Sequence, residues 1–160
     1  GRAGAGGGVV WRGRRLADAR RLDLRDLDHL PDGARRRAIR AMSNGLGTIN
    51  EIRPLADAAH AHDALVLVDA CQWVPHVATD VQAWDADFVA FSSHKMCGPT
   101  GTGALWARRE HLQAMPPVFG GGEMILEVRV EGAVFNDPPP QVKAGPPNIP
   151  GFIRLGAAGD

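Results

Sequence analysis

Several residue types are scarce in this sequence of 160 residues, and their scarcity narrows the possible classes of protein. The chain has no tyrosine, and its two cysteines, Cys71 and Cys97, make neither a disulfide framework nor a CxxC pair. So few cysteines are typical of a protein of the reducing cytoplasm. No apolar run has the length of a membrane span, and no signal-peptide pattern occurs. We therefore expect a cytoplasmic protein.

The chain also lacks an excess of charge of either sign. Eighteen basic residues balance eighteen acidic residues, so the formal net charge is zero at pH 7. A neutral chain does not offer the strongly basic surface that attracts nucleic acids or anionic membranes. We therefore expect no nucleic acid and no membrane among the partners.

Lysine is scarce as well: the chain has two lysines, Lys95 and Lys143, but sixteen arginines. Lys95 lies in "FSSHKMCGPTGTG", where an apolar run meets a turn rich in glycine and proline. Arginine stays protonated and cannot act as a nucleophilic amine, whereas a desolvated lysine can lose its proton. A lone lysine at a strand end is usually only a surface charge, so its surroundings have to decide its role.

The first 37 residues differ from the rest in composition. Eleven of the sixteen arginines lie in the first forty residues, interleaved with aspartates over residues 18–32. Such interleaving favours a solvated face over a nucleic-acid patch. The opening "GAGGGVV" has neither a preceding strand nor the GxGxxG spacing of a dinucleotide loop. We interpret residues 1–37 as a weakly ordered N-terminal edge.

From residue 38 onward, strand-like and helix-like segments alternate. Apolar, β-rich segments predict strands over residues 38–42, 64–72, 87–92 and 103–107. Helical spacing or turn chemistry predicts helices over residues 51–63 and 109–115, a short helix near 81–85 and a long helix beginning near Pro150. The continuous run "ALVLVDACQ" is typical of a strand buried on both faces. This order predicts an α/β fold with a mostly parallel open sheet and flanking helices.

Polar and ionisable residues follow three of the predicted strands. Asn44 is expected to end the first strand, Asp69 lies just after "LVLV" of the second, and Ser92, His94 and Lys95 lie just after "FVAF" of the third. Ligands of open α/β sheets bind beyond the carboxyl ends of the strands, so we expect these side chains to converge on one edge. An amine, a carboxylate and hydroxyl donors suit pyridoxal 5'-phosphate, which carries an aldehyde, a ring nitrogen and a phosphate.

Four segments together resemble one enzyme family. They are "SNGLGTINEI", "VLVDACQ", "FVAFSSHKMCGPTGTGALWA" and "AGPPNIPG", in this order within residues 38–160. With them the chain resembles the class V aminotransferases, and within these the Suf-type (group II) cysteine desulfurases and selenocysteine lyases. The resemblance implies the large domain of a fold-type I pyridoxal-phosphate enzyme. Residues 38–160 would be its central part, without the N-terminal part and the C-terminal domain.

The resemblance implies roles for six residues. Lys95 is implied to form the Schiff base with the cofactor and to move the substrate's Cα proton, and Asp69 to hold the proton of the pyridine nitrogen. The cofactor-binding set that the resemblance implies is Asn44, Asp69, Gln72, Ser92, His94 and Lys95. No metal is implied. For Asn44 and Gln72, an ordinary role as a helix cap or a polar strand end remains an alternative.

Three positions depart from the family pattern, and a cysteine near Lys95 needs separate interpretation. Ala70 and Cys71 stand where glycine and alanine are usual, and Pro146 replaces a threonine that is implied to reach the phosphate of a neighbouring subunit. Cys97 lies two residues after Lys95. The family carries its catalytic cysteine on a later loop of the C-terminal domain. We therefore interpret Cys97 as a structural thiol of the buried kind.

The resemblance implies a cysteine desulfurase that converts L-cysteine to L-alanine. A cysteine outside these residues would take the sulfur as a persulfide and pass it to an acceptor protein for iron-sulfur assembly, in a protein that is a homodimer when complete. Two alternatives remain open. One is another class V reaction, such as that of a selenocysteine lyase, a kynureninase-like hydrolase or an epimerase. The other is a catalytically silent, degenerate homologue. We expect the 160 residues alone to be inactive.

Overall fold

The structure is a computed structural model that describes residues 36–117, 119–130 and 132–159. The interpretation of residues 1–37 as a weakly ordered edge falls almost entirely outside these ranges. The described elements, in chain order, are β1 (Arg36–Arg40), α1 (Ile52–His60), β2 (Leu65–Asp69), β3 (Phe88–Ser92), the 3-10 helix η3 (Ser93–Lys95), β4 (Gly103–Ala107), α2 (Arg109–Ala114), β5 (Ile125–Arg129), β6 (Gly132–Phe135), the 3-10 helix η4 (Pro140–Val142) and α3 (Ile149–Gly159).

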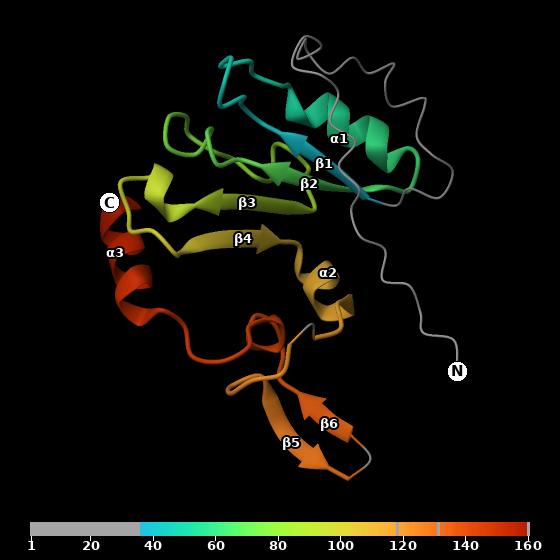
Figure 1. Cartoon of the computed structure of the whole chain (residues 1–160). Helices are drawn as coiled ribbons and strands as arrows, with labels where there is room; N and C mark the ends of the chain where they lie inside the picture. Colours follow the sequence, from blue (N-terminus) through green and yellow to red (C-terminus); the bar gives the residue numbers. More distant parts are fainter. Residues whose placement is uncertain (1–35, 118, 131, 160) are drawn as a thin grey trace.

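Four strands form one open sheet in the order β1-β2-β3-β4 (Figure 1). The pairs β1-β2 and β2-β3 are parallel, and β4 runs antiparallel to β3. The prediction of a mostly parallel α/β sheet is confirmed. Because β3 and β4 are antiparallel, residues 93–102 connect them directly instead of crossing over the sheet. The end of β3 and the start of β4 therefore lie at the same edge.

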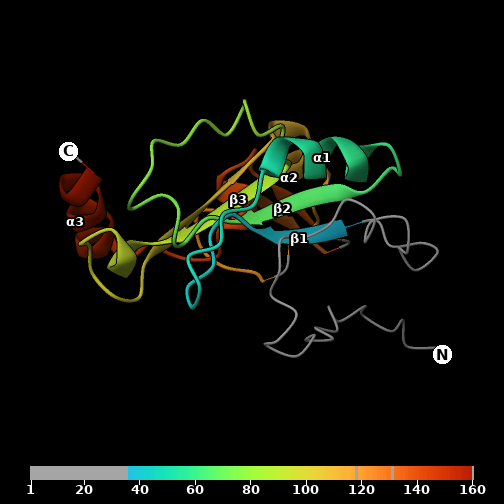
Figure 2. The same ribbon diagram turned by 90° about the horizontal axis from the view of Figure 1, so that it is seen from above.

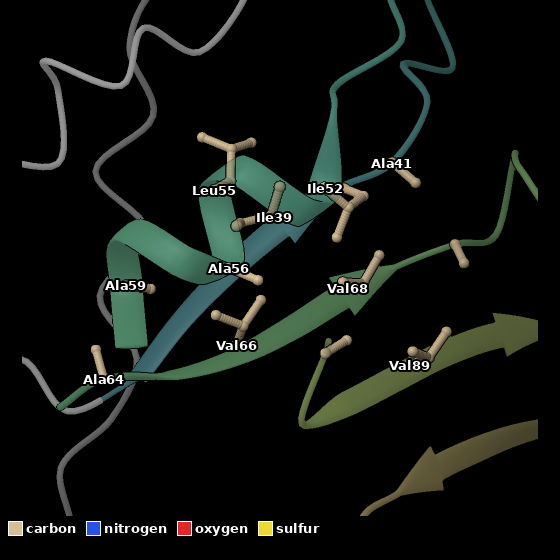
Figure 3. Packing of buried hydrophobic residues seen from close by; sticks show 12 residues of the cluster. Ile39, Ala41, Ile52, Leu55, Ala56, Ala59, Ala64, Val66, Val68 and Val89 are labelled. Atoms are coloured by element: carbon tan, nitrogen blue, oxygen red, sulfur yellow. The ribbon is translucent and has the colours of Figure 1, made fainter. Parts of the chain in front are cut away.

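Helix α1 covers one face of the sheet, and the hydrophobic core lies between this helix and the strands (Figures 2 and 3). Its buried residues recur every three or four positions, which places them on one side of the helix. They are Ile52, Leu55, Ala56 and Ala59. They pack with Ile39 of β1 and with Val66 and Val68 of β2 in a single apolar cluster. This packing holds β1 and β2 side by side.

Strand β2 is buried on one face only, so the prediction of burial on both faces is wrong for this strand. Val66 and Val68 are fully buried on the side of α1, whereas Leu65, Leu67 and Asp69 on the other face are only partly buried. Alternate side chains of a strand point to opposite faces, so the uncovered face is the one that carries Asp69.

A buried carboxylate joins the sheet to two helices at the start of β3. Asp87 is 4% exposed and accepts a hydrogen bond of 2.7 Å from the backbone N–H of Val66. The Nε2 atoms of His60 and His111 each lie 2.8 Å from one of its oxygens. Burial raises the pKa of Asp87, but hydrogen bonds with His60, Val66 and His111 outweigh it, and the pKa lies below its usual range. This cluster fixes the start of the strand that ends at Ser92.

The short helix predicted near residues 81–85 is absent, because this segment forms turns. The carboxylate of Asp80 accepts hydrogen bonds from the backbone N–H groups of Gln82 and Ala83, at 2.9 and 3.1 Å. An aspartate that bonds its own following backbone favours a turn over a helix. Asp85 then takes a positive φ of 53°, which a continuing α-helix does not contain.

The antiparallel hairpin of β5 and β6 is an element that the sequence analysis does not predict, and it projects away from the four-stranded sheet (Figure 1). Its apolar side chains are exposed, among them Leu126 and Val128. A hairpin without a buried face gives no clear alternation of apolar and polar residues. In the described part of the chain, no helix has the length and apolar character needed to cross a membrane.

Candidate active site

Asp69 is the last residue of β2 and lies on the sheet face that α1 leaves uncovered. Its Oδ1 accepts a hydrogen bond of 3.1 Å from the backbone N–H of Cys71. Its Oδ2 lies 3.7 Å from Nε of Arg40, which is its register partner on β1. The Asp69 side chain is 47% exposed, so its carboxylate remains accessible at the edge of the sheet.

Lys95 is the last residue of η3, which follows directly on β3. The side chain is half-buried, and no hydrogen bond or ion pair joins its amine to another residue of the described ranges. The backbone around Lys95 is held by several hydrogen bonds. The carbonyl of Ser93 accepts hydrogen bonds from the N–H groups of Met96 and Gly98, and the Ser93 N–H donates to Thr102. A loop with a hydrogen-bonded backbone therefore carries an amine that has no partner among the described residues.

Ser92 and Asp69 end neighbouring strands, as the sequence predicts. Cys71 connects the two, because its Sγ lies 3.4 Å from Oγ of Ser92 while its N–H bonds Asp69. In the register of β2 and β3, Asp69 faces Ala90, two residues before Ser92. The carboxylate and the hydroxyl therefore lie at one edge of the sheet.

Asn44 and Gln72 meet at the same edge, although Asn44 does not end a strand. β1 stops at Arg40, and Asn44 lies in the turn that follows. A bridge between Met42 and Ile49 closes this turn. The side-chain amide of Gln72 donates a hydrogen bond to Oδ1 of Asn44. The turn after β1 is therefore attached to the segment that follows Asp69.

His94 and Cys97 lie in and after the 3-10 helix that follows β3, and the structure bears differently on the two predictions made for them. His94 is exposed in η3, next to Lys95, and no hydrogen bond or ion pair joins it to the other predicted side chains among the described residues. The interpretation of Cys97 as a buried thiol is wrong, because the residue is exposed and has a φ of 59°. Its position at a turn, away from strand packing, explains this exposure.

Two further residues, which the sequence alone does not indicate, shape the site. One is Gly98: a Cβ added there would lie 2.3 Å from Oγ of the fully buried Ser93, so any side chain at this position forces Ser93 or the loop to shift. The glycines of "CGPTGTG" are the signal that could have indicated such close contact. Arg40 is the second residue, and the sequence does not indicate its role because an ion pair across two strands leaves no local pattern.

The pattern of the family described as aminotransferase class-V matches residues 7–160. The chain belongs to the class-V aminotransferase family. Cysteine desulfurases and other class-V aminotransferases are pyridoxal-phosphate enzymes. The predicted resemblance is thereby confirmed at the level of the family.

Similar proteins agree with this assignment. The chain is 53% identical over 123 residues to a probable cysteine desulfurase of Xylella fastidiosa strain 9a5c, covering 77% of this chain and 30% of that protein. It is 47% identical over 155 residues to a cysteine desulfurase of Dickeya dadantii, covering 96% and 38%. The crystal structure of the Escherichia coli cysteine desulfurase CsdA, in its S-sulfonic acid form, matches with a TM-score of 0.80 and 39% identity, covering 85% of this chain and 34% of that one.

These matches confirm the predicted fold class, an α/β part of the large domain of a fold-type I pyridoxal-phosphate enzyme. The chain spans about a third of the length of the relatives that it matches, from 28% to 38%.

The side chains at the sheet edge of this class-V chain fit pyridoxal 5'-phosphate in their chemistry. Lys95 offers an amine without a partner in the described ranges, and Asp69 offers an ionisable carboxylate that is half exposed. Ser92 adds a hydroxyl, and Gln72 adds an amide held by Asn44. The cofactor needs an amine for its aldehyde, a carboxylate for its ring nitrogen and polar donors for its oxygens.

Proposed function

We propose that the whole protein containing this chain is a pyridoxal-phosphate-dependent cysteine desulfurase of the Suf type. The observation that carries the proposal is the meeting of Asp69 and Ser92 at one edge of the sheet, next to the loop of Lys95. Its family membership and relatives named cysteine desulfurase support it. The substrate would be L-cysteine, whose C–S bond breaks to leave L-alanine. The sulfur would pass to the thiol of an enzyme cysteine outside these residues, forming a persulfide.

Lys95 and Asp69 would carry the chemistry at the cofactor. When bound, pyridoxal phosphate supplies an aldehyde for covalent attachment and a protonated ring that draws electrons from the substrate's Cα. Nζ of Lys95 would hold the cofactor and then move the Cα proton of the substrate. The carboxylate of Asp69 would hold the proton on the ring nitrogen, because a negative charge beside this nitrogen favours its protonated form.

The remaining residues would bind and orient. Ser92 and His94 would donate hydrogen bonds to the phosphate, which multiple donors stabilise. Gln72 would donate to the phenolic oxygen of the cofactor, and its bond to Asn44 would restrict its rotamer. Asn44 would then lie near the cofactor and the substrate carboxylate. In this arrangement one hydrogen-bonded pair orients both the cofactor and the amino acid.

The wider setting follows from the same proposal. The whole protein would be a cytoplasmic homodimer, and its persulfide sulfur would pass to an acceptor protein for iron-sulfur assembly. Two interacting subunits agree with the exposed apolar side chains of β5, such as Leu126 and Val128, which are 66% and 75% exposed. The 160 residues alone are not expected to release sulfur from cysteine.

Chemical labelling of Lys95 tests the proposal directly. The whole protein is loaded with pyridoxal phosphate, reduced with borohydride and digested, and we expect the label on the peptide that contains Lys95. Lys95→Ala should remove the label and abolish alanine formation from L-cysteine. Lys143 is a built-in control, because it is the other lysine of this chain and pairs with Glu123 at 3.3 Å.

Three results would contradict the proposal. Label on Lys143 instead of Lys95 would refute the assignment of the site. Retained label without turnover of L-cysteine would indicate a catalytically silent homologue. Turnover of L-selenocysteine, L-kynurenine or an epimerisable amino acid in place of L-cysteine would indicate another class-V reaction.

A further inference from the structure

Arg40 occupies a position beside Asp69 that the proposed function does not use. The two residues are register partners at the ends of β1 and β2, so their side chains leave the same face of the sheet as neighbours. Nε of Arg40 lies 3.7 Å from Oδ2 of Asp69. Among the described residues, Arg40 is the cation within ion-pair distance of this carboxylate.

The backbone holds Arg40 in this place. Its carbonyl accepts a hydrogen bond of 2.7 Å from the side-chain amide of Asn50, and the following N–H, of Ala41, donates to the carbonyl of Asp69 at 2.9 Å. The end of β1 is therefore bonded to the residue whose carboxylate faces the guanidinium. Because the backbone is fixed, the Arg40 side chain remains within reach of Asp69.

The carboxylate of Asp69 is consequently shared. Oδ1 already accepts the N–H of Cys71, and Oδ2 faces the guanidinium of Arg40. A carboxylate offers about four acceptor positions, so these contacts leave room for another donor. The permanent positive charge of the Arg40 guanidinium nevertheless weakens the negative potential that Asp69 exerts on any ligand facing its carboxylate.

We propose that Arg40 is a positioning and charge-tuning residue for the cofactor site, which lowers the proton affinity of bound pyridoxal phosphate by sharing the carboxylate of Asp69. This inference rests on the proposed function, because it requires the cofactor to face Asp69. Among the described residues, no other ion pair reaches this carboxylate: Ala90 lies opposite Asp69 on β3, Cys71 contacts Ser92, and His94 and Lys95, which follow β3, form no ion pair with it. Arg40 is therefore the residue whose replacement changes the local charge.

The exposure of Arg40 and Asp69 limits how far Arg40 can shift the titration of the bound cofactor. The Arg40 and Asp69 side chains are 48% and 47% exposed, so water weakens the interaction. For partly exposed charges a few ångströms apart, removal of one charge shifts a neighbouring titration by about 0.5–1 pH unit. Salt reduces such shifts, so the difference between variants should shrink at high ionic strength.

The experiment measures the pH midpoint of the visible absorption change of bound pyridoxal phosphate in the whole protein, without substrate. Arg40→Gln and Arg40→Thr remove the charge and should raise the midpoint by about 0.5–1 unit. Arg40→Lys keeps the charge and should stay near the wild-type midpoint. Arg36→Gln is the matched control, because Arg36 is exposed at the opposite end of β1, on the same face as Arg40. It should leave the midpoint unchanged.

The outcomes separate this inference from the proposed function. A wild-type protein that retains the cofactor on Lys95, with the same midpoint in Arg40→Gln and Arg40→Thr, would overturn the role of Arg40 alone. An Arg40→Lys midpoint that moves as far as that of the neutral variants would also overturn it, because charge would then not be the cause. A wild-type protein that does not retain the cofactor on Lys95 would overturn both proposals.

Discussion

Nε2 of His60 lies 2.8 Å from Oδ2 of Asp87, so the last residue of α1 is bonded to the residue that precedes β3. His111 of α2 contacts the other carboxylate oxygen at the same distance. One buried carboxylate therefore ties together two helices and the strand that leads to the candidate active site. A network of this kind is costly to disrupt, because removal of one partner leaves buried polar groups unpaired.

Acid should destabilise the protein through Asp87. The folded-state pKa of Asp87 lies below its usual value of 3.8, so its ionised form contributes stability that is fully present above about pH 4. This contribution is lost as the pH falls through the lower, folded-state pKa. Asp87→Asn should lower the free energy of unfolding by about 3 kcal/mol at pH 7 and by less near pH 3.

Urea denaturation of the whole protein at both pH values measures this effect. Asp57→Asn is the control, because Asp57 pairs with Arg53 on the exposed side of α1 and such pairs contribute less than about 1 kcal/mol. An Asp87→Asn protein with unchanged stability at pH 7 would show that the cluster is not a structural anchor.

Replacing Asp69 by asparagine should slow catalysis more than it weakens cofactor binding. The amide keeps the shape of the side chain but removes the negative charge that, in the proposed function, faces the ring nitrogen. A charge placed in an active site typically contributes about 10²–10³-fold to the rate. We expect a loss of this size in kcat for alanine formation, with pyridoxal phosphate still bound. Asp63→Asn, at an exposed turn, serves as the control, and near-normal turnover of Asp69→Asn would refute the assigned role.

Gly98→Ala should distort the loop that carries Lys95. The new Cβ would lie 2.3 Å from Oγ of Ser93 and 3.0 Å from its carbonyl oxygen, so the loop has to shift. Overpacking of this kind costs about 1–3 kcal/mol. We expect lower stability in urea and weaker binding of pyridoxal phosphate.

A double-mutant cycle identifies the cause of this effect. Ser93→Ala removes the buried hydroxyl, which has no hydrogen-bond partner among the described residues, so the cost of Gly98→Ala should be smaller in this background. Gly45→Ala is the control, because its Cβ would meet nothing within 4 Å. Additive effects of the two changes would show that Ser93 is not what excludes a side chain at position 98.

The sequence predicts the sheet well where local pattern and packing agree. "GALWA" forms β4 over the predicted residues, and "DFVAFS" forms β3 with a start one residue later. The first strand is displaced: β1 covers residues 36–40 instead of 38–42. Its arginines carry no apolar signal, because most of this strand is not buried.

The sequence also predicts which polar residues lie near the edge, because strand ends are visible as the end of an apolar run. It does not reveal their partners. His60 and Asp87 are separated by 27 residues, and Asn44 and Gln72 by 28. Contacts of such separation depend on how strands are ordered in the sheet, and periodicity carries no information about this order. For the same reason, the sequence does not predict that β4 runs antiparallel to β3.

Because β3 and β4 are connected directly, the two sides of the candidate active site should form at different stages of folding. Residues 92–103 form a closed hairpin, in which Ser92 pairs with Gly103 and Lys95 lies between them. Such local contacts lose little chain entropy and form fast, whereas the pairing of β1 with β2 brings together distant residues. We expect the lysine hairpin to gain protection in pulsed hydrogen exchange before Asp69 meets Arg40. The Lys95 side of the candidate active site would then form as a local unit, whereas the Asp69 side would form only when the whole sheet assembles.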